Sequence, residues 1–192
     1  MKTFVLLLAA LPVFAQVAPK STAAAAPAPT AAKSSPTAQT KAVRIPLSAF
    51  VTLERVFDTK VSGLSADNAG PVDLLGATRG VYLDGFGAVF TTELGLIQTP
   101  TINPFNSTIT DAQKTRVHSA KVTRLPGLRK LISAALHDMA VGLPQIPETE
   151  QIVLAIRLDY SSWENTAGLP GLLVAKADRR SALAGNIQVQ EQ

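Results

Sequence analysis

The chain of 192 residues contains no cysteine. This absence excludes disulfides, thiolate metal sites, cysteine nucleophiles and the lipidated cysteine of a lipoprotein. Aromatic residues make up only 5% of the sequence. The longest apolar run, within residues 4–14, is about half of the ~20 residues that cross a bilayer. We therefore expect a fold held by its apolar core alone.

Basic and acidic residues are equal in number in residues 43–192, although the whole chain is basic. The sequence carries 18 Lys and Arg against 14 Asp and Glu. Four of the lysines lie within residues 1–42, so residues 43–192 hold 14 basic and 14 acidic side chains. Nucleic-acid binding needs a clustered basic surface, commonly with aromatic residues for stacking. The composition argues against a nucleic-acid partner.

Residues 1–15 have the order of a secretory signal peptide. Lys2 precedes the apolar run, and Val13-Phe14-Ala15 supplies a small residue at the expected cleavage position before Gln16. We predict cleavage between Ala15 and Gln16, export to the periplasm or outside the cell, and no stable membrane span afterwards. The alternative is an uncleaved anchor, which the shortness of the run disfavours. Residues 16–42, mostly Ala, Pro, Ser, Thr and Lys, are typical of a disordered linker.

Residues 43–192 match one domain in length. Ser48 is predicted to cap a helix over residues 48–59, and residues 66–76 read as a loop with a turn at 67–71. Asp84-Gly85 between two strand-like runs predicts a hairpin of residues 79–83 and 86–96 with a two-residue type I′ turn. In that register Leu83 faces Phe86, and Tyr82 faces Gly87 on the polar face that also carries Glu93.

The second half of the domain alternates helices and strands. Thr110 and Gln113 form a capping box that opens a helix over residues 110–123, and Leu125-Pro126-Gly127 separates it from an amphipathic helix over 128–142. Strands follow at 151–160 and 172–176, and Asp178 is predicted to cap a last helix over 179–184. If the middle helices form a hairpin, the second and third strands are antiparallel and both hairpin tips share one edge. If they are one kinked helix, the tips separate.

This order (α-β-β-α-α-β-β-α) predicts a single α+β domain. Its helices are expected to pack on one face of a roughly four-stranded, mainly antiparallel sheet.

Motifs of known catalytic or metal centres are absent from the sequence. It contains no G-x-S-x-G, S-x-x-K or H-E-x-x-H. His118 and His137 are too far apart to share one helical turn, and we expect each to be a solvated helix histidine. We predict no catalytic residue, no metal and no cofactor.

Six residues are candidates for a binding surface on the polar face and rim of the sheet. They are Tyr82, Glu93, Arg157, Asp159, Trp163 and Glu164. Cross-strand ion pairs on a solvated face would explain the charges alone. A binding surface would also explain Tyr82, Arg157 and Trp163, because these residue types anchor interfaces. A third interpretation uses two of the carboxylates as acid and base, but no spacing shows that they converge.

The segments TRGVYLDGFGAVFTTEL (residues 78–94) and SWENTAGLP (162–170) resemble those of a group of uncharacterised exported bacterial proteins. The likeness runs from about Leu53 to Lys176. It implies a bacterial envelope setting and supplies no catalytic or binding residues. We therefore expect an exported, non-enzymatic module that binds an envelope protein or wall component. The alternative is a hydrolase of a wall or extracellular substrate that uses paired carboxylates, and the oligomeric state stays open.

Overall fold

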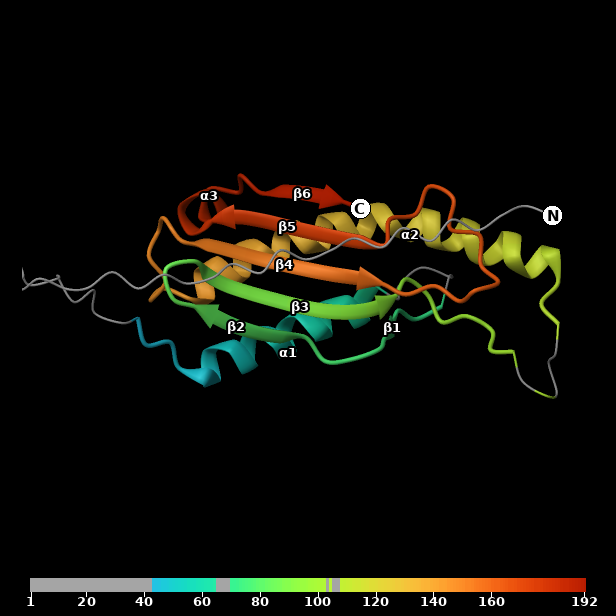
Figure 1. The fold of residues 1–192 in the computed structure, drawn as a ribbon, viewed down its shortest axis with the longest axis horizontal. Helices are drawn as coiled ribbons and strands as arrows, with labels where there is room; N and C mark the ends of the chain where they lie inside the picture. Colours follow the sequence, from blue (N-terminus) through green and yellow to red (C-terminus); the bar gives the residue numbers. More distant parts are fainter. Residues whose placement is uncertain (1–42, 65–69, 103, 105–107) are drawn as a thin grey trace, which may run out of the picture. The chain divides into compact units, whose positions relative to one another are not determined.

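The computed structural model describes residues 43–64, 70–102, 104 and 108–192 (Figure 1). The predicted signal peptide with its Ala15–Gln16 cleavage site, the linker and most of the turn at 67–71 lie outside the described residues. The elements in chain order are α1 (Leu47–Gly63), β1 (Asp73–Leu74), β2 (Arg79–Leu83), β3 (Gly87–Gly95), α2 (Asp111–Gly142), β4 (Gln151–Leu158), β5 (Leu172–Asp178), α3 (Arg179–Leu183) and β6 (Gln188–Glu191).

The described strands form one mixed sheet of six in the order β1-β3-β4-β5-β6, with β2 also paired to β3 (Figure 1). β3 and β4 are parallel, and the other pairs are antiparallel. The prediction of four mainly antiparallel strands missed β1 and β6. Residues 73–74 belong to a strand rather than to the expected loop, and β6 holds a single apolar residue, so neither has an alternating pattern to detect.

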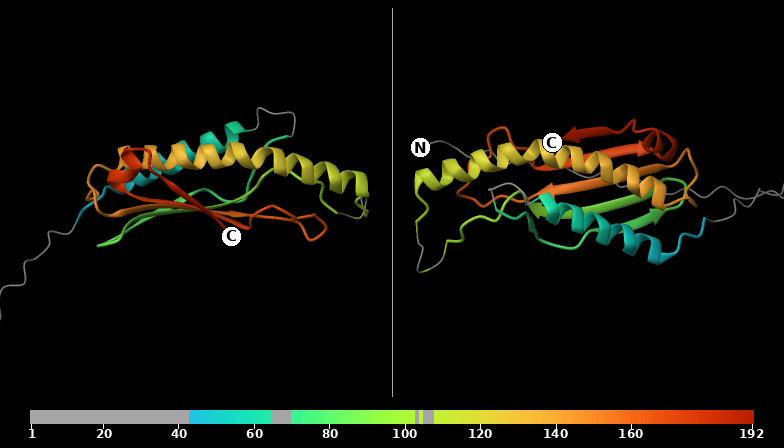
Figure 2. Two further views of the ribbon diagram at one scale, coloured as in Figure 1. Left: turned by 90° about the horizontal axis from the view of Figure 1, so that it is seen from above. Right: turned by 180° about the vertical axis from the view of Figure 1, so that it is seen from behind.

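The helices lie on one face of the sheet, as the left view of Figure 2 shows, which confirms the predicted α+β class. The core lies between the two layers and includes Phe57 of α1, Phe90 of β3, Leu136 of α2 and Ile156 of β4, each at most 1% exposed. We call the opposite face of the sheet, which none of the described helices covers, the outer face.

The helix α2 is continuous over 32 residues and contains Pro126. The prediction of a break at residues 125–127 was wrong. Proline removes one backbone hydrogen bond, but its neighbours Leu125 and Leu128 are buried, and this packing holds the helix together. The capping box of Thr110 and Gln113 is confirmed. Of the two arrangements left open, the single helix is the correct one, so β4 runs parallel to β3 and the hairpin tips separate.

The register of the β2–β3 hairpin differs from the prediction by one residue. Leu83 pairs with Gly87 rather than facing Phe86, which leaves a three-residue loop. Within this fully described hairpin, positive φ is confined to Gly85 (75°) and Gly87 (127°), whereas a type I′ turn also requires it at Asp84.

This shift exchanges the two faces of β2. Val81 and Leu83 lie on the outer face and are about half exposed, although they were expected in the core. Tyr82 pairs with Ala88 on the core face, so its expected place opposite Gly87 on the polar face was wrong. Gly87 is needed for another reason: a Cβ there would lie 1.9 Å from the carbonyl oxygen of Gln151.

The predicted cap residue is confirmed for α3 and is wrong for α1. Asp178 caps α3 by accepting the Ser181 N–H at 2.8 Å, as predicted. The helix α1 begins at Leu47, so Ser48 lies inside it and Pro46 occupies the cap position without a side-chain acceptor.

The helix α1 also covers the backbone of β2, an edge strand. Glu54 accepts the Gly80 N–H at 2.8 Å, and Asp58 accepts the Thr78 N–H at 3.2 Å. Both carboxylates accept hydrogen bonds from backbone N–H groups that could otherwise pair with an added strand.

Candidate binding site

The structure separates the six candidate residues into four places. Tyr82 lies near the β2–β3 turn, where its hydroxyl donates to Glu150 Oε2 at 2.9 Å. Burial, the hydrogen bond and the negative charge of Glu150 raise the pKa of Tyr82 to about 12. Because Tyr82 pairs with Ala88, it is separated from Glu93 by five residues along β3, or about 17 Å. Tyr82 does not share a surface with the other candidates.

Glu93 and Arg157 do meet, on the outer face at the C-terminal ends of the parallel strands β3 and β4. They are register partners, and Arg157 Nε lies 3.5 Å from Glu93 Oε1. Both side chains are solvent-exposed, so the pair contributes about 0–1 kcal/mol to stability. Asp159 follows β4 at this end, and its N–H donates to the Leu94 carbonyl at 3.0 Å.

The outer face is less polar than its sequence suggested. The register places Val89, Val153, Ala155 and Val174 at its centre. At the end near the β2–β3 turn, Val81 is 51% exposed, Leu83 47% and Phe86 45%. The result is an apolar strip flanked by charged side chains, among them Arg79, Arg157 and Lys176.

Glu164 lies on the other side of the sheet, in the loop after β4. Its carboxylate pairs with Lys121 of α2, and the two side chains are 2% and 1% exposed. Glu164 also accepts the Ser161 N–H at 3.1 Å. Lys121 Nζ lies 4.6 Å from the centre of the Tyr160 ring, a cation–π contact. Burial and the charge of Glu164 raise the pKa of Tyr160 to about 12.

These positions separate Glu164 from Glu93. Glu93 projects from the outer face beside Arg157, whereas Glu164 is held under α2 by Lys121. None of the three hollows described below is lined by Glu93, Asp159 or Glu164. Glu164 and Glu93 therefore do not form an acid–base pair.

Trp163 lines an open hollow of about 340 Å³ at the C-terminal ends of β3 and β4. Its walls are residues 99–102, in the loop after β3, and residues 161–163, in the loop after β4. The two loops meet because adjacent parallel strands end at the same edge, which is where ligands bind in many α/β proteins. The sequence left open whether these two strands are parallel or antiparallel, so it did not predict this juxtaposition.

Two buried cations of α2 hold these loops in place. Arg124 is 2% exposed and donates to the carbonyls of Leu96 at 2.9 Å and Gly70 at 2.6 Å. Lys121, one helical turn earlier, holds the second loop through Glu164. Figure 1 shows that the N-terminal half of α2 extends beyond the ends of β3 and β4, above this region. Sequence reasoning overlooked both cations.

The histidines are not the freely solvated residues that we expected. His118 Nδ1 lies 2.9 Å from the Asn165 carbonyl oxygen, and His137 Nδ1 lies 3.0 Å from that of Ala182. Each ring therefore links α2 to a segment packed beside it, the loop after β4 or α3.

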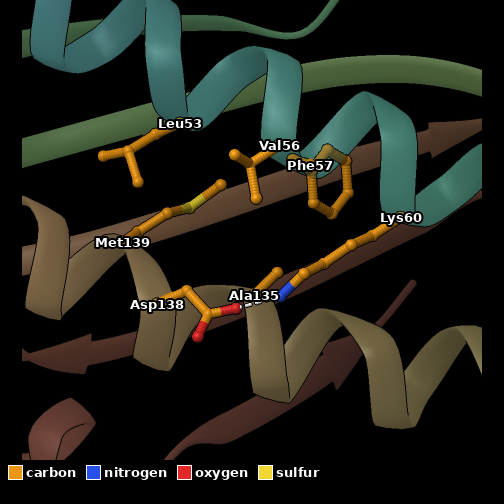
Figure 3. Close-up of a pocket in the computed structure, with 7 residues that line it drawn as sticks. All are labelled: Leu53, Val56, Phe57, Lys60, Ala135, Asp138 and Met139. Atoms are coloured by element: carbon orange, nitrogen blue, oxygen red, sulfur yellow. Dashed lines mark hydrogen bonds and ion pairs between the residues drawn. The ribbon is translucent and has the colours of Figure 1, made fainter.

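Two further hollows carry less chemistry. The crevice between α1 and α2 in Figure 3, crossed by the Lys60–Asp138 ion pair, has a volume of about 10 Å³, room for about one water molecule. An open hollow of about 360 Å³ beside α3 contains Glu148 and Arg180, which pair at 2.9 Å. Its Asp178 caps α3.

Searches of the described residues for two other kinds of site found none. No helix there is long and apolar enough to span a membrane, and no group of three His, Asp or Glu side chains could hold a metal ion. The chain matches no protein-family model, and comparisons with curated proteins and with solved structures found no match.

Proposed function

We propose that this protein is an exported, non-enzymatic interaction module of the bacterial envelope, which binds a protein partner through the outer face of its sheet. Export rests on the leader sequence, and residues 16–42 have the Pro-containing composition of an extended spacer. The observation that carries the binding proposal is the apolar strip on the outer face. It replaces the polar face expected from the sequence.

Exposed apolar side chains gathered on one surface are typical of protein-binding sites. Val81 and Leu83 lie on the outer face, Phe86 lies in the adjoining β2–β3 loop, and none of the three belongs to the core between sheet and helices. Valines at the centre of the strip add a flat apolar area that water covers in the isolated domain.

The charges around the strip indicate the chemistry of the partner. Arg157 is compensated in part by Glu93, but Lys176 and Arg79 flank the strip from β5 and β2. Arg79 is 3.8 Å from Glu54 and remains largely exposed. The surface therefore suits a protein with an apolar centre and a polar rim that complements both these basic side chains and Glu93.

The test compares two pairs of substitutions in the full chain. Val81→Gln with Phe86→Gln removes apolar area from the outer face. Val122→Gln with Val141→Gln changes side chains of similar exposure, 44% and 56%, on α2 in the other layer. A photo-crosslinker at Leu83 should form a product of defined mass in envelope extract. The outer-face double variant should lose this product, and the α2 double variant should keep it.

Equal crosslinking by both double variants would contradict the proposal, as would the absence of any product from Leu83. A crosslinker placed at Val141 serves as the positional control and should yield a different product or none. Circular dichroism would establish that both variants are folded.

A further inference from the structure

The hollow at the C-terminal ends of β3 and β4 is a second surface with its own chemistry, independent of the outer face. Its volume of about 340 Å³ lies at the lower end of the range for small-molecule sites, about 300–1,000 Å³. We propose that it binds a neutral carbohydrate, with a sugar ring packed against Trp163.

The lining carries one aromatic platform and many hydroxyl groups. Trp163 is the sole tryptophan of the chain, and the residues that line the hollow with it are Thr99, Thr101, Ser161 and Ser162, which carry hydroxyls, and Pro100 and Ile102. The C–H groups on one face of a sugar ring carry partial positive charge and pack against the electron-rich face of an indole. Each protein hydroxyl both donates and accepts, which matches the hydroxyls at the edge of a sugar.

The same lining disfavours charged ligands. As far as the described residues define it, the wall of the hollow contains no ionisable side chain. A phosphate or carboxylate ligand would call for an Arg or Lys that reaches it. The nearby buried cations Lys121 and Arg124 are engaged with Glu164 and with backbone carbonyls.

Trp163 is presented by a turn that the fold holds rigidly. The Glu164 N–H donates to the Ser161 carbonyl at 3.0 Å, and the Ser161 N–H donates back to Glu164 Oε1 at 3.1 Å. Glu164 is fixed in turn by Lys121, and the Tyr160 hydroxyl donates to the Pro170 carbonyl at 2.7 Å. A loop already ordered before binding avoids the entropy cost of ordering it around a ligand.

The experiment uses the intrinsic fluorescence of Trp163 in the full chain. The probes are an oligomer of β-linked N-acetylglucosamine, an oligomer of β-linked glucose, inorganic phosphate and a proline-rich peptide. A saturable change in fluorescence is expected with at least one of the two oligosaccharides at up to millimolar concentration. Phosphate and the peptide should give none.

Substitutions then locate the site, with calorimetry as the readout because the Trp163 variants lack the fluorophore. Trp163→Ala should weaken oligosaccharide binding at least about 30-fold, and Trp163→Phe, which keeps a ring, less than about tenfold. Thr101→Val should weaken binding by removing one hydroxyl. Val141→Ala, a change of an exposed apolar residue near the C-terminal end of α2, should leave binding unchanged.

Three results would overturn the proposal: no saturable response to either oligosaccharide, binding of the peptide or phosphate alone, or oligosaccharide binding that survives Trp163→Ala in a folded protein. Since the outer-face variants do not touch the hollow, failure of one proposal leaves the other intact.

Discussion

The buried ion pair between Lys121 and Glu164 provides the sharpest test of this structure. Its two side chains are 1% and 2% exposed. Replacing Lys121 with Met leaves a carboxylate buried without its partner, and such a loss costs about 3–5 kcal/mol in the free energy of unfolding. This is a large part of the roughly 5–15 kcal/mol that stabilises a typical domain. The Tyr160 ring loses its cation as well.

A matched control is available on the same helix. Lys114 pairs with Asp111 at 3.0 Å, but the Asp111 side chain is almost fully exposed. Lys114→Met should therefore lower stability by no more than about 0.5 kcal/mol. Urea unfolding followed by circular dichroism measures both variants. Trp163 fluorescence reports separately on the loop next to the pair.

The double variant Lys121→Met, Glu164→Gln completes the cycle. It leaves no buried charge, and the amide oxygen introduced by Glu164→Gln can still accept the Ser161 N–H, so the double variant should be more stable than Lys121→Met alone. Strong non-additivity is thus expected. If Lys121→Met costs no more than Lys114→Met, or if the double variant shows the sum of the two single effects, the pair is not buried as described.

The chain has two tyrosines, and burial raises the pKa of both Tyr82 and Tyr160 to about 12. The fold therefore favours the neutral phenols, and this stabilisation should be complete below about pH 10 and disappear as the pH rises towards 12. Near-ultraviolet absorbance measures the ionisation of the tyrosines, and unfolding assays measure the stability. Half-ionisation of the tyrosines near their ordinary pKa of about 10 in the folded protein would contradict this prediction. Gly87→Ala should destabilise the protein by at least about 2 kcal/mol in urea unfolding, because the φ of 127° disfavours alanine and the added Cβ would clash with the Gln151 carbonyl oxygen. Gly76→Ala, where an added Cβ meets open space, should change stability by less than about 1 kcal/mol. Glu54→Leu uncovers the edge of β2 and should cause concentration-dependent association in light scattering, while Glu54→Gln, which keeps an acceptor for Gly80, should not.

Structural features that depend on neighbours in the sequence could be predicted. The capping box of Thr110 and Gln113 and the Asp178 cap each need residues only three positions apart. The strand β4 could also be predicted, because Ile152 and Leu154 alternate with residues that face outward. These signals determine the class of the fold and most of its elements.

Features that depend on distant contacts could not be predicted. Pro126 is compatible with a helix end or a helix interior, and the packing of Leu125 and Leu128 decides between them. The continuity of α2 in turn decides that β4 returns parallel to β3, which brings the two lining loops of the hollow together. Without the parallel pairing of β3 and β4, the sequence does not show which loop lies beside Trp163.

The predicted faces of the β2 side chains were wrong because the register of the hairpin differs by one residue from the prediction. Asp84-Gly85 fits a two-residue turn in composition, but the observed loop has three residues. Every side chain of β2 changes face as a result. Tyr82 thereby leaves the outer face, and Val81 and Leu83 lie on it.

The sequence does contain a signal for the loops around Trp163, in the buried stripe of α2. Val117, Lys121, Arg124 and Leu128 follow one another at helical spacing, and all four are buried. A cation on a buried stripe requires buried acceptors, because an unpaired charge there costs several kcal/mol. The sheet ends below this part of the helix, and the acceptors come from the loops that follow β3 and β4 and from Gly70, before β1. Two cations on the apolar side of a long helix therefore predict ordered loops at the end of a sheet, and ordered loops are what a rigid binding site requires.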